Sequence, residues 1–190
     1  MPRLDSVLTL LVAIGLLLAS VAGMADDKAA SRDALRQMRK ETLEQLYKEN
    51  PQARNQIRSA AGFGVFEVAG VHILFVGGSG GRGVVKDNLT GRDTYMNMGA
   101  VAGGLGVGFQ DTRTVLIFKK RKVLKDFLEQ GWTFGGDARA IAQVEGKGGS
   151  VGELETPEGI IVYQLTKAGL SVKATVQGTK FWRDPDLNTK

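Results

Sequence analysis

The chain has 190 residues, a formal net charge of +5 and no cysteine. The lack of cysteine excludes disulfides, thiol catalysis and thiolate-bound metal or iron–sulfur centres. The positive charge favours anionic partners such as phospholipid head groups, acidic polymers or nucleic acid. A single histidine among scattered carboxylates offers no metal-ligand spacing, so we expect no metal and no cofactor.

The first 25 residues have the layout of a secretory signal peptide. Arg3 precedes an apolar run from Val7 to Val21, and the small residues Gly23 and Ala25 stand before the expected cut. An uncleaved signal-anchor helix is the alternative, because the apolar run could nearly span a bilayer. We therefore expect an exported protein, periplasmic or secreted or held peripherally on a membrane. Export makes nucleic acid the least expected of the anionic partners.

Residues 26–60 are expected to form an N-terminal helical segment. The sequence "DKAASRDALRQMRKETLEQLYKEN" has no glycine or proline and is rich in good helix formers. Pro51 in "NPQA" predicts a break, followed by a second, shorter helix. Apolar residues at roughly helical spacing form one stripe along the first helix: Leu35, Met38, Leu46 and Tyr47.

Residues 61–190 are expected to form a Gly-rich β region, and residues 26–190 are expected to fold as one domain. The segments "FGVFEV" and "VHILFV" predict two strands joined by a tight turn at Ala69–Gly70, and "NLTG" predicts a later turn. One helix, "KKRKVLKDFLEQG", interrupts the strands and ends at Gly131. The segments "WTFGGDARAIAQV", "GIIVYQL" and the alternating "LSVKATVQ" predict further strands. This order predicts an α+β fold, with N-terminal helices packed on a curved, mainly antiparallel sheet and one inserted helix.

The stretch "FVGGSGGRGVV", residues 75–85, contains two glycine patterns that resemble catalytic motifs. Three of its glycines match G-x-G-x-x-G, the dinucleotide-binding fingerprint. Ser79 is the serine of a G-x-S-x-G match, the nucleophile elbow of hydrolases. Both chemistries require a helix directly after the glycines, whereas "VVKDNLTG" predicts a strand and a turn. His72 precedes Ser79 on the adjoining strand, and no acidic group is placed to complete a site. We interpret the glycines as sites of sharp bends and close approach, and we expect no enzyme activity; a hydrolase using Ser79 is the minor alternative.

Alternating glycines in "GGLGVGF" also predict a strand face without side chains, which another element or an acyl chain could approach closely: Gly104, Gly106 and Gly108.

Five segments follow one another in a specific order: "LYKENPQARNQIRSAAGFGVF", "GGSGGRGVV", "MNMGAVAGGLGVGFQ", "TVLIFKKRKVLKDFLEQGWTFGGDARAIAQ" and "KAGLSVKATVQGTKFW". In this order, from about Leu43 to Trp182, they resemble the SYLF domain family, also called YSC-type domains. The resemblance implies a non-catalytic lipid-binding module. Eukaryotic relatives bind phosphoinositides and take part in actin-linked membrane traffic, whereas bacterial relatives are mostly exported.

Two departures from the family pattern leave the ligand preference open. The chain has "TYMNMG" where the family usually places a proline and aromatic residues, and "GVGFQDT" where Gly-x-Gln-x-Gly is common. An actin-linked role is not expected of this chain, because an exported protein would meet no actin. The expected function is binding of an anionic phospholipid or membrane surface. The alternative is an envelope structural or interaction protein that binds an acidic polymer or a protein partner.

The first candidate lipid-binding cluster lies on the basic face of the N-terminal helix. A basic amphipathic helix can lie in a membrane interface, with its apolar stripe in the acyl boundary. The alternative is that the stripe packs on the β region and the charges are solvated. The residues of this cluster are Arg32, Arg36, Arg39 and Lys40.

The second candidate cluster lies where a strand leads into the inserted helix. Its cations repel one another and lie beside the positive end of a helix dipole, so an anionic partner would stabilise them. Arg82, inside the glycine stretch, is a further candidate because the missing side chains around it would let a phosphate approach. The residues of the second cluster are Lys119, Lys120, Arg121, Lys122 and Lys125.

Overall fold

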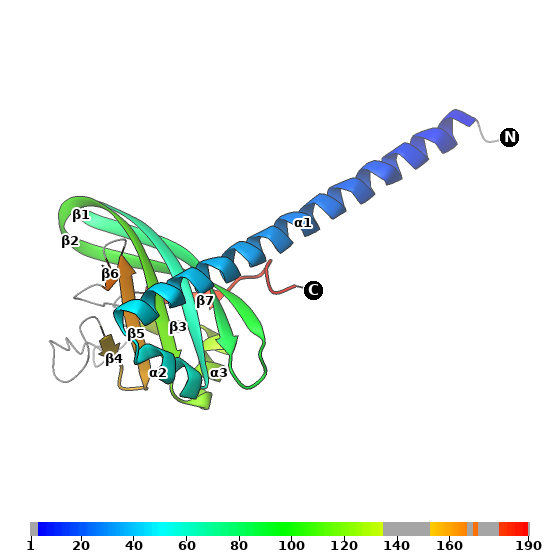
Figure 1. Ribbon diagram of the computed structural model, residues 1–190. Coiled ribbons are helices and arrows are strands. Elements are labelled where there is room, and N and C mark those ends of the chain that lie inside the picture. The colour runs from blue at the N-terminus through cyan, green and yellow to red at the C-terminus, as the bar shows by residue number, and fades with distance from the viewer. Residues whose placement is uncertain (1–3, 135–152, 167–168, 171–178, 190) are drawn as a thin grey trace.

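The structure is a computed structural model that describes residues 4–134, 153–166, 169–170 and 179–189 (Figure 1). Its helices are α1 (Leu4–Glu49), α2 (Ala53–Ser59) and α3 (Arg121–Gln130). Its described strands are β1 (Gly62–Asp87), β2 (Asp93–Phe118), β3 (Trp132–Phe134), β4 (Glu153–Glu155), β5 (Ile160–Thr166), β6 (Gly169–Leu170) and β7 (Thr179–Arg183). Helices followed by an antiparallel sheet with α3 inserted confirm the predicted α+β class.

The sheet is organised around one long hairpin. β1 and β2 pair antiparallel from Gly62 opposite Phe118 to Lys86 opposite Asp93. The other edge of β2 pairs with β7 near its start and with β5 near its end, while β4 and β6 flank β5 and β3 flanks β7. The predicted turn at Ala69–Gly70 is wrong, because both residues continue the β1 ladder opposite β2.

The glycines of β1 allow the two halves of this strand to approach each other as the sheet curls. A Cβ atom on Gly83 would lie 2.4 Å from the Val65 carbonyl oxygen and 2.4 Å from the Phe66 ring. A Cβ atom on Gly81 would overlap the Glu67 carbonyl oxygen. The glycine stretch therefore serves close backbone approach, as predicted, and it lies within a strand that no helix follows.

Side chains alternate between the two faces of the sheet and fill two apolar clusters. The face under α1 and α2 buries Val65, Val115 and Ile117 against residues of both helices. The opposite face buries Phe66, Leu116 and Phe118 against α3. This alternation is the period-2 pattern expected of strands covered on both faces. The chain therefore forms three layers, with α1 and α2 on one side of the sheet and α3 on the other.

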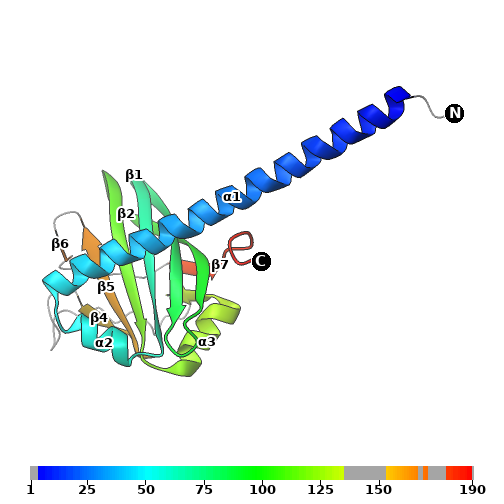
Figure 2. The same ribbon diagram turned by 45° about the vertical axis from the view of Figure 1, so that its right-hand side comes forward.

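Helix α1 crosses the face of the sheet, and its N-terminal part extends beyond it (Figures 1 and 2). Its predicted apolar stripe is buried where it meets the sheet, at Leu35, Met38 and Leu46. The predicted break at Pro51 is confirmed, because α1 ends at Glu49 and α2 follows. No helix within the part of the chain that was searched, the described residues, is long and apolar enough to cross a membrane.

Two predicted ends of elements are confirmed by their backbone geometry. Gly131 ends α3 with a φ of 73°, and its N–H donates to the Phe127 carbonyl oxygen at 3.1 Å. Gly91 closes the turn between β1 and β2 with a φ of 69°. Glycine adopts such positive φ values without the steric cost that a Cβ would add. The predicted strand "LSVKATVQ" beyond Leu170, most of "WTFGGDARAIAQV" and the side-chain environment of "GGLGVGF" lie outside the described residues.

Candidate functional site

Three segments meet at one end of the sheet: the end of α2, the turn between β1 and β2, and the start of α3. Asn88 in the turn donates from Nδ2 to the carbonyl oxygens of Ile57 (2.7 Å) and Ala60 (3.0 Å). Arg121 at the start of α3 reaches the same turn through Asp87. We call this region the basic end, because it gathers the following cations: Arg58, Lys86, Arg92, Lys119, Lys120, Arg121, Lys122 and Lys125.

Helix α3 presents an uncapped N-terminus to this region. Its N-cap residue, Lys120, offers no side-chain hydrogen bond, and the first turn contains no acidic residue. The first backbone N–H groups of a helix carry partial positive charge and lack partners within the helix. Leu124 and Phe127 are fully buried against the sheet and hold α3 in this orientation. The helix dipole and the lysines therefore create positive potential at the same place.

Asp87 joins the turn to α3. Its carboxylate accepts hydrogen bonds from Arg121 Nη1 at 2.5 Å and Nη2 at 2.8 Å. It also accepts the backbone N–H groups of Leu89 (2.9 Å) and Thr90 (3.2 Å), which fixes the turn. The Arg121 guanidinium is the main cause that holds the pKa of Asp87 well below its usual range, and the backbone donors act in the same direction against the effect of burial.

We expect Asp87→Asn to lower the free energy of unfolding at neutral pH by about 1–2 kcal/mol, because the amide loses charge-assisted hydrogen bonds. The folded pKa is depressed, so the stabilisation is present above the unfolded pKa of about 3.9 and disappears as pH falls through the folded pKa. Urea unfolding at a series of pH values should therefore show the two proteins converging below about pH 4. The control is Asp126→Asn, which removes an exposed ion pair with Lys122. An equal loss in both variants would contradict the special role of Asp87.

Most cations of the second predicted cluster form ion pairs with carboxylates. Lys119 Nζ lies 2.8 Å from Glu155 Oε1, and Arg121 pairs with Asp87. Lys122 and Lys125 pair with carboxylates one turn later on α3, Asp126 and Glu129. Within the described residues, Lys120 is the member of this cluster with no ion pair. These pairs relieve much of the mutual repulsion on which the sequence prediction depended.

The first predicted cluster binds helix α1 to the rest of the domain. Arg39 Nη1 lies 2.6 Å from Asp93 Oδ1, and both side chains are largely buried. Arg36 pairs with the same carboxylate at 3.3 Å. Arg32 Nε donates to the Leu187 carbonyl oxygen at 2.9 Å. Three of its four cations are therefore used within the fold.

Two predicted site residues lie apart from the basic end. Lys40 is exposed on α1, beside Arg39. Arg82 is exposed on β1, where it pairs across the ladder with Asn97. The structure thus brings together the cluster around α3 but does not bring Arg82 or the α1 face to it.

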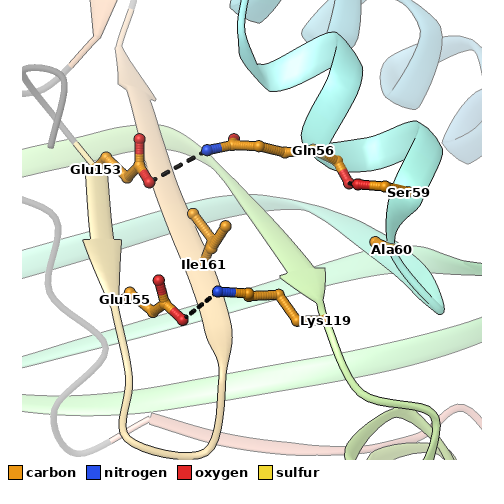
Figure 3. A pocket seen from close by; sticks show the side chains of 7 residues that line it. All are labelled: Gln56, Ser59, Ala60, Lys119, Glu153, Glu155 and Ile161. Carbon is orange, nitrogen blue, oxygen red and sulfur yellow. Dashed lines mark hydrogen bonds and ion pairs between the residues drawn. The ribbon is translucent and has the colours of Figure 1, made fainter.

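A shallow cavity of about 300 Å³ adjoins the basic end between α2, β4 and the end of β2 (Figure 3). Figure 3 shows two polar pairs across it, Gln56 with Glu153 and Lys119 with Glu155. Ser59 also lines it, but its hydroxyl lies 2.9 Å from the Asn55 carbonyl oxygen, within hydrogen-bond distance in the same helix. In the described residues, no group of three or more histidine, aspartate or glutamate side chains could hold a metal ion.

A buried tyrosine contacts two of the residues that line this cavity. The Tyr163 hydroxyl lies 2.8 Å from Glu153 Oε2 and 2.7 Å from Gln56 Oε1. Burial is the main cause that raises the pKa of Tyr163 far above its usual range, and the nearby Glu153 carboxylate adds to it. The phenol therefore stays protonated and joins β5 to β4 and α2, which is a structural role.

The amino-acid sequence of this chain is similar to a known protein family and to a curated protein. Residues 99–190 match the sequence model of the Ysc84 family, described as Las17-binding protein actin regulator. The SYLF resemblance is confirmed. Beta cell expansion factor A from Aeromonas veronii is 29% identical over 157 residues, which is 83% of this chain. The chain spans 59% of the length of that relative.

The part that matches the SYLF family model includes most of β2, all of α3 and the strands that follow. It therefore contains the second basic cluster, while α1, α2 and the turn after β1 precede it. The family description names binding of a protein and regulation of actin, not a reaction. These comparisons agree with a binding domain and carry no assignment of a catalytic residue.

The acidic partners that organise the basic end were not predicted from the sequence. Asp87 follows a strand and precedes "NLTG", a position where aspartate commonly accepts turn N–H groups, so its turn role could have been predicted. Its pairing with Arg121, 34 positions away, has no local signature. The pairing of Asp93 with Arg39, which is 54 positions away in the sequence, also has no local signature.

Proposed function

We propose that this chain is an exported, non-catalytic protein whose SYLF-type domain binds anionic lipid or a membrane surface through the basic end. The observation that carries the proposal is the start of α3, where an uncapped helix N-terminus coincides with four successive cations. Helix N-termini bind anions through their free N–H groups and dipole. A phosphate group is the anion that a membrane offers at high surface density.

The ion pairs of the basic end leave it able to bind phosphate. Lys122 and Lys125 are paired within α3, but the Lys122 side chain is 84% exposed. Exposed pairs of this type contribute only about 0.3–0.5 kcal/mol, so a phosphate can replace the carboxylate at little cost. Each cation near an anionic surface contributes about 1 kcal/mol at moderate salt. The cations of the basic end outnumber the carboxylates with which they pair, so the region can attract an anionic surface.

Export is part of the proposal and is supported by the sequence of residues 1–25, with one basic residue, an apolar run and small residues before the expected cut. In this proposal the exported form begins after Ala25, and α1 retains the residues that pack on the sheet. The intact mass of the protein recovered after secretion tests the cut: a mass lacking residues 1–25 is expected, and full-length protein would contradict it.

Cosedimentation with vesicles tests the lipid proposal. The exported form should bind phosphatidylglycerol–phosphatidylcholine vesicles but not phosphatidylcholine alone, and binding should weaken between about 0.1 M and 1 M salt because the Debye length falls from about 10 Å to 3 Å. A triple variant, Lys120→Gln, Lys122→Gln and Lys125→Gln, should bind at least tenfold more weakly. This loss corresponds to about 1.4 kcal/mol or more.

The matched control removes the same number of exposed charges elsewhere, in the triple variant Lys40→Gln, Lys48→Gln and Lys180→Gln. This control should bind about as well as the parent protein. Equal losses in both variants would show a dependence on total charge and would overturn the assignment to α3. Binding to a soluble polyanion without binding to vesicles would instead support an acidic polymer as the partner.

A further inference from the structure

Leu89 is the most exposed large apolar side chain in the part of the chain whose side chains are described. It is 80% exposed at the tip of the turn between β1 and β2, and Trp182 follows at 41%. A single exposed leucine is common on protein surfaces and implies nothing alone. At Leu89, two further observations accompany the exposure: the turn is held by hydrogen bonds, and cations flank it in the sequence and contact it through Asp87.

The turn that carries Leu89 is fixed by hydrogen bonds on both sides. The Asp87 carboxylate accepts the Leu89 N–H at 2.9 Å, and the Asp87 carbonyl oxygen accepts the Gly91 N–H at 2.8 Å. The Asn88 side chain donates hydrogen bonds to two backbone carbonyl groups at the end of α2. A segment that is already ordered loses little conformational entropy when it binds. Leu89 is therefore presented outward by a preorganised turn.

The charges around Leu89 are predominantly positive. Lys86 and Arg92 flank the turn in sequence, Arg121 contacts it through Asp87, and Lys122 follows at the start of α3. The two nearest carboxylates in sequence are already bound: Asp87 pairs with Arg121, and Asp93 pairs with both Arg36 and Arg39. An apolar side chain on a turn with cations on both sides of it in the sequence is complementary to an anionic bilayer, whose phosphates lie above its acyl chains.

We infer that Leu89 inserts into the boundary between the head groups and acyl chains of an anionic bilayer, while the surrounding cations of the basic end bind lipid phosphates. This inference rests on the proposed function and adds a specific anchor and an orientation: the turn between β1 and β2 faces the membrane, together with the start of α3. Insertion removes the leucine side chain from water, which supplies an apolar contribution that salt does not screen.

Site-specific labelling tests the insertion directly, because the chain has no cysteine. Leu89→Cys in the exported form is labelled with an environment-sensitive nitrobenzoxadiazole dye and mixed with phosphatidylglycerol–phosphatidylcholine vesicles. A blue shift and quenching by lipids spin-labelled on the acyl chain are expected. The same dye at Lys48→Cys, on α1, should show neither change.

Unlabelled Leu89→Ser should bind about tenfold more weakly, and Leu89→Phe should bind as well as the parent protein.

The outcomes separate this inference from the proposed function. Vesicle binding by the parent protein with no dye response and no loss in Leu89→Ser would overturn insertion and leave electrostatic lipid binding intact. No vesicle binding by the parent protein under any condition would overturn both. Loss of binding in Leu89→Ser counts for insertion only with an unchanged urea unfolding midpoint, since the side chain is exposed and the fold should not depend on it.

Discussion

Gly83→Ala is expected to destabilise the protein by about 3 kcal/mol, the upper part of the range for overpacked interiors. The new methyl group would lie 2.4 Å from the Val65 carbonyl oxygen and 2.4 Å from Phe66 Cδ1. The aromatic ring is itself fully buried and in contact with Phe181, so it has little room to move. Relief therefore requires a shift of the β1 backbone. Urea unfolding monitored by tryptophan fluorescence measures the loss.

The glycine stretch supplies its own control. Gly78 lies five positions earlier, and no heavy atom lies within 4 Å of the place where its Cβ would stand. Gly78→Ala should therefore change the free energy of unfolding by less than about 1 kcal/mol, and reduced freedom of the unfolded chain could make that change stabilising. Similar losses in Gly78→Ala and Gly83→Ala would contradict the assignment of Gly83 to close approach between the halves of β1.

Phe127→Ala is expected to cost about 3–5 kcal/mol, the range for truncating a buried aromatic side chain. The Phe127 ring is fully buried, with centroids 4.8 Å from that of Phe118 and 5.4 Å from that of Phe181. A helix as short as α3 is not stable without tertiary packing. Loss of this anchor should therefore destabilise the whole domain and release the start of α3. Thermal and urea unfolding measure the first effect.

Limited trypsin digestion measures the second effect, because α3 contains Lys122 and Lys125. Cleavage at these lysines should be faster in Phe127→Ala than in the parent protein under conditions where both are mostly folded. Glu129→Ala, an exposed substitution on the same helix, should stay within about 0.5 kcal/mol of the parent protein and keep its digestion rate. A small stability loss in Phe127→Ala, comparable with that control, would show that the aromatic cluster does not hold α3 in place.

Local sequence patterns predicted several elements correctly. Pro51 separates two helices, Gly131 ends α3, and "NLTG" forms the turn after β1. Each depends on residues a few positions apart. The predicted turn at Ala69–Gly70 was wrong because glycine marks turns and sites of close approach alike. Gly70 is of the second type: its Cβ would lie 2.7 Å from Ser79 Cβ, in the other half of the same strand.

The sequence predicted which cations belong to the candidate site but not the ion pairs that these cations form. The sequence identified Lys119–Lys122 as a run of adjacent cations. It could not show that Glu155 and Asp87, 36 and 34 positions away from Lys119 and Arg121, pair with two of them. It also could not distinguish these cations from the helical arginines, of which Arg39 is buried against Asp93.

The sequence by itself determined where α1 and α3 end, the lack of thiol chemistry and the supply of cations, since these depend on residue type and short spacing. The tertiary structure decided which cations are used within the fold and which face solvent, because ion pairing depends on distances set by the long β1–β2 hairpin. It also decided the role of the glycines. Only the curl of that hairpin brings Gly83 against Val65, and only the junction of α2, the turn and α3 places the turn that carries Leu89 beside Arg121.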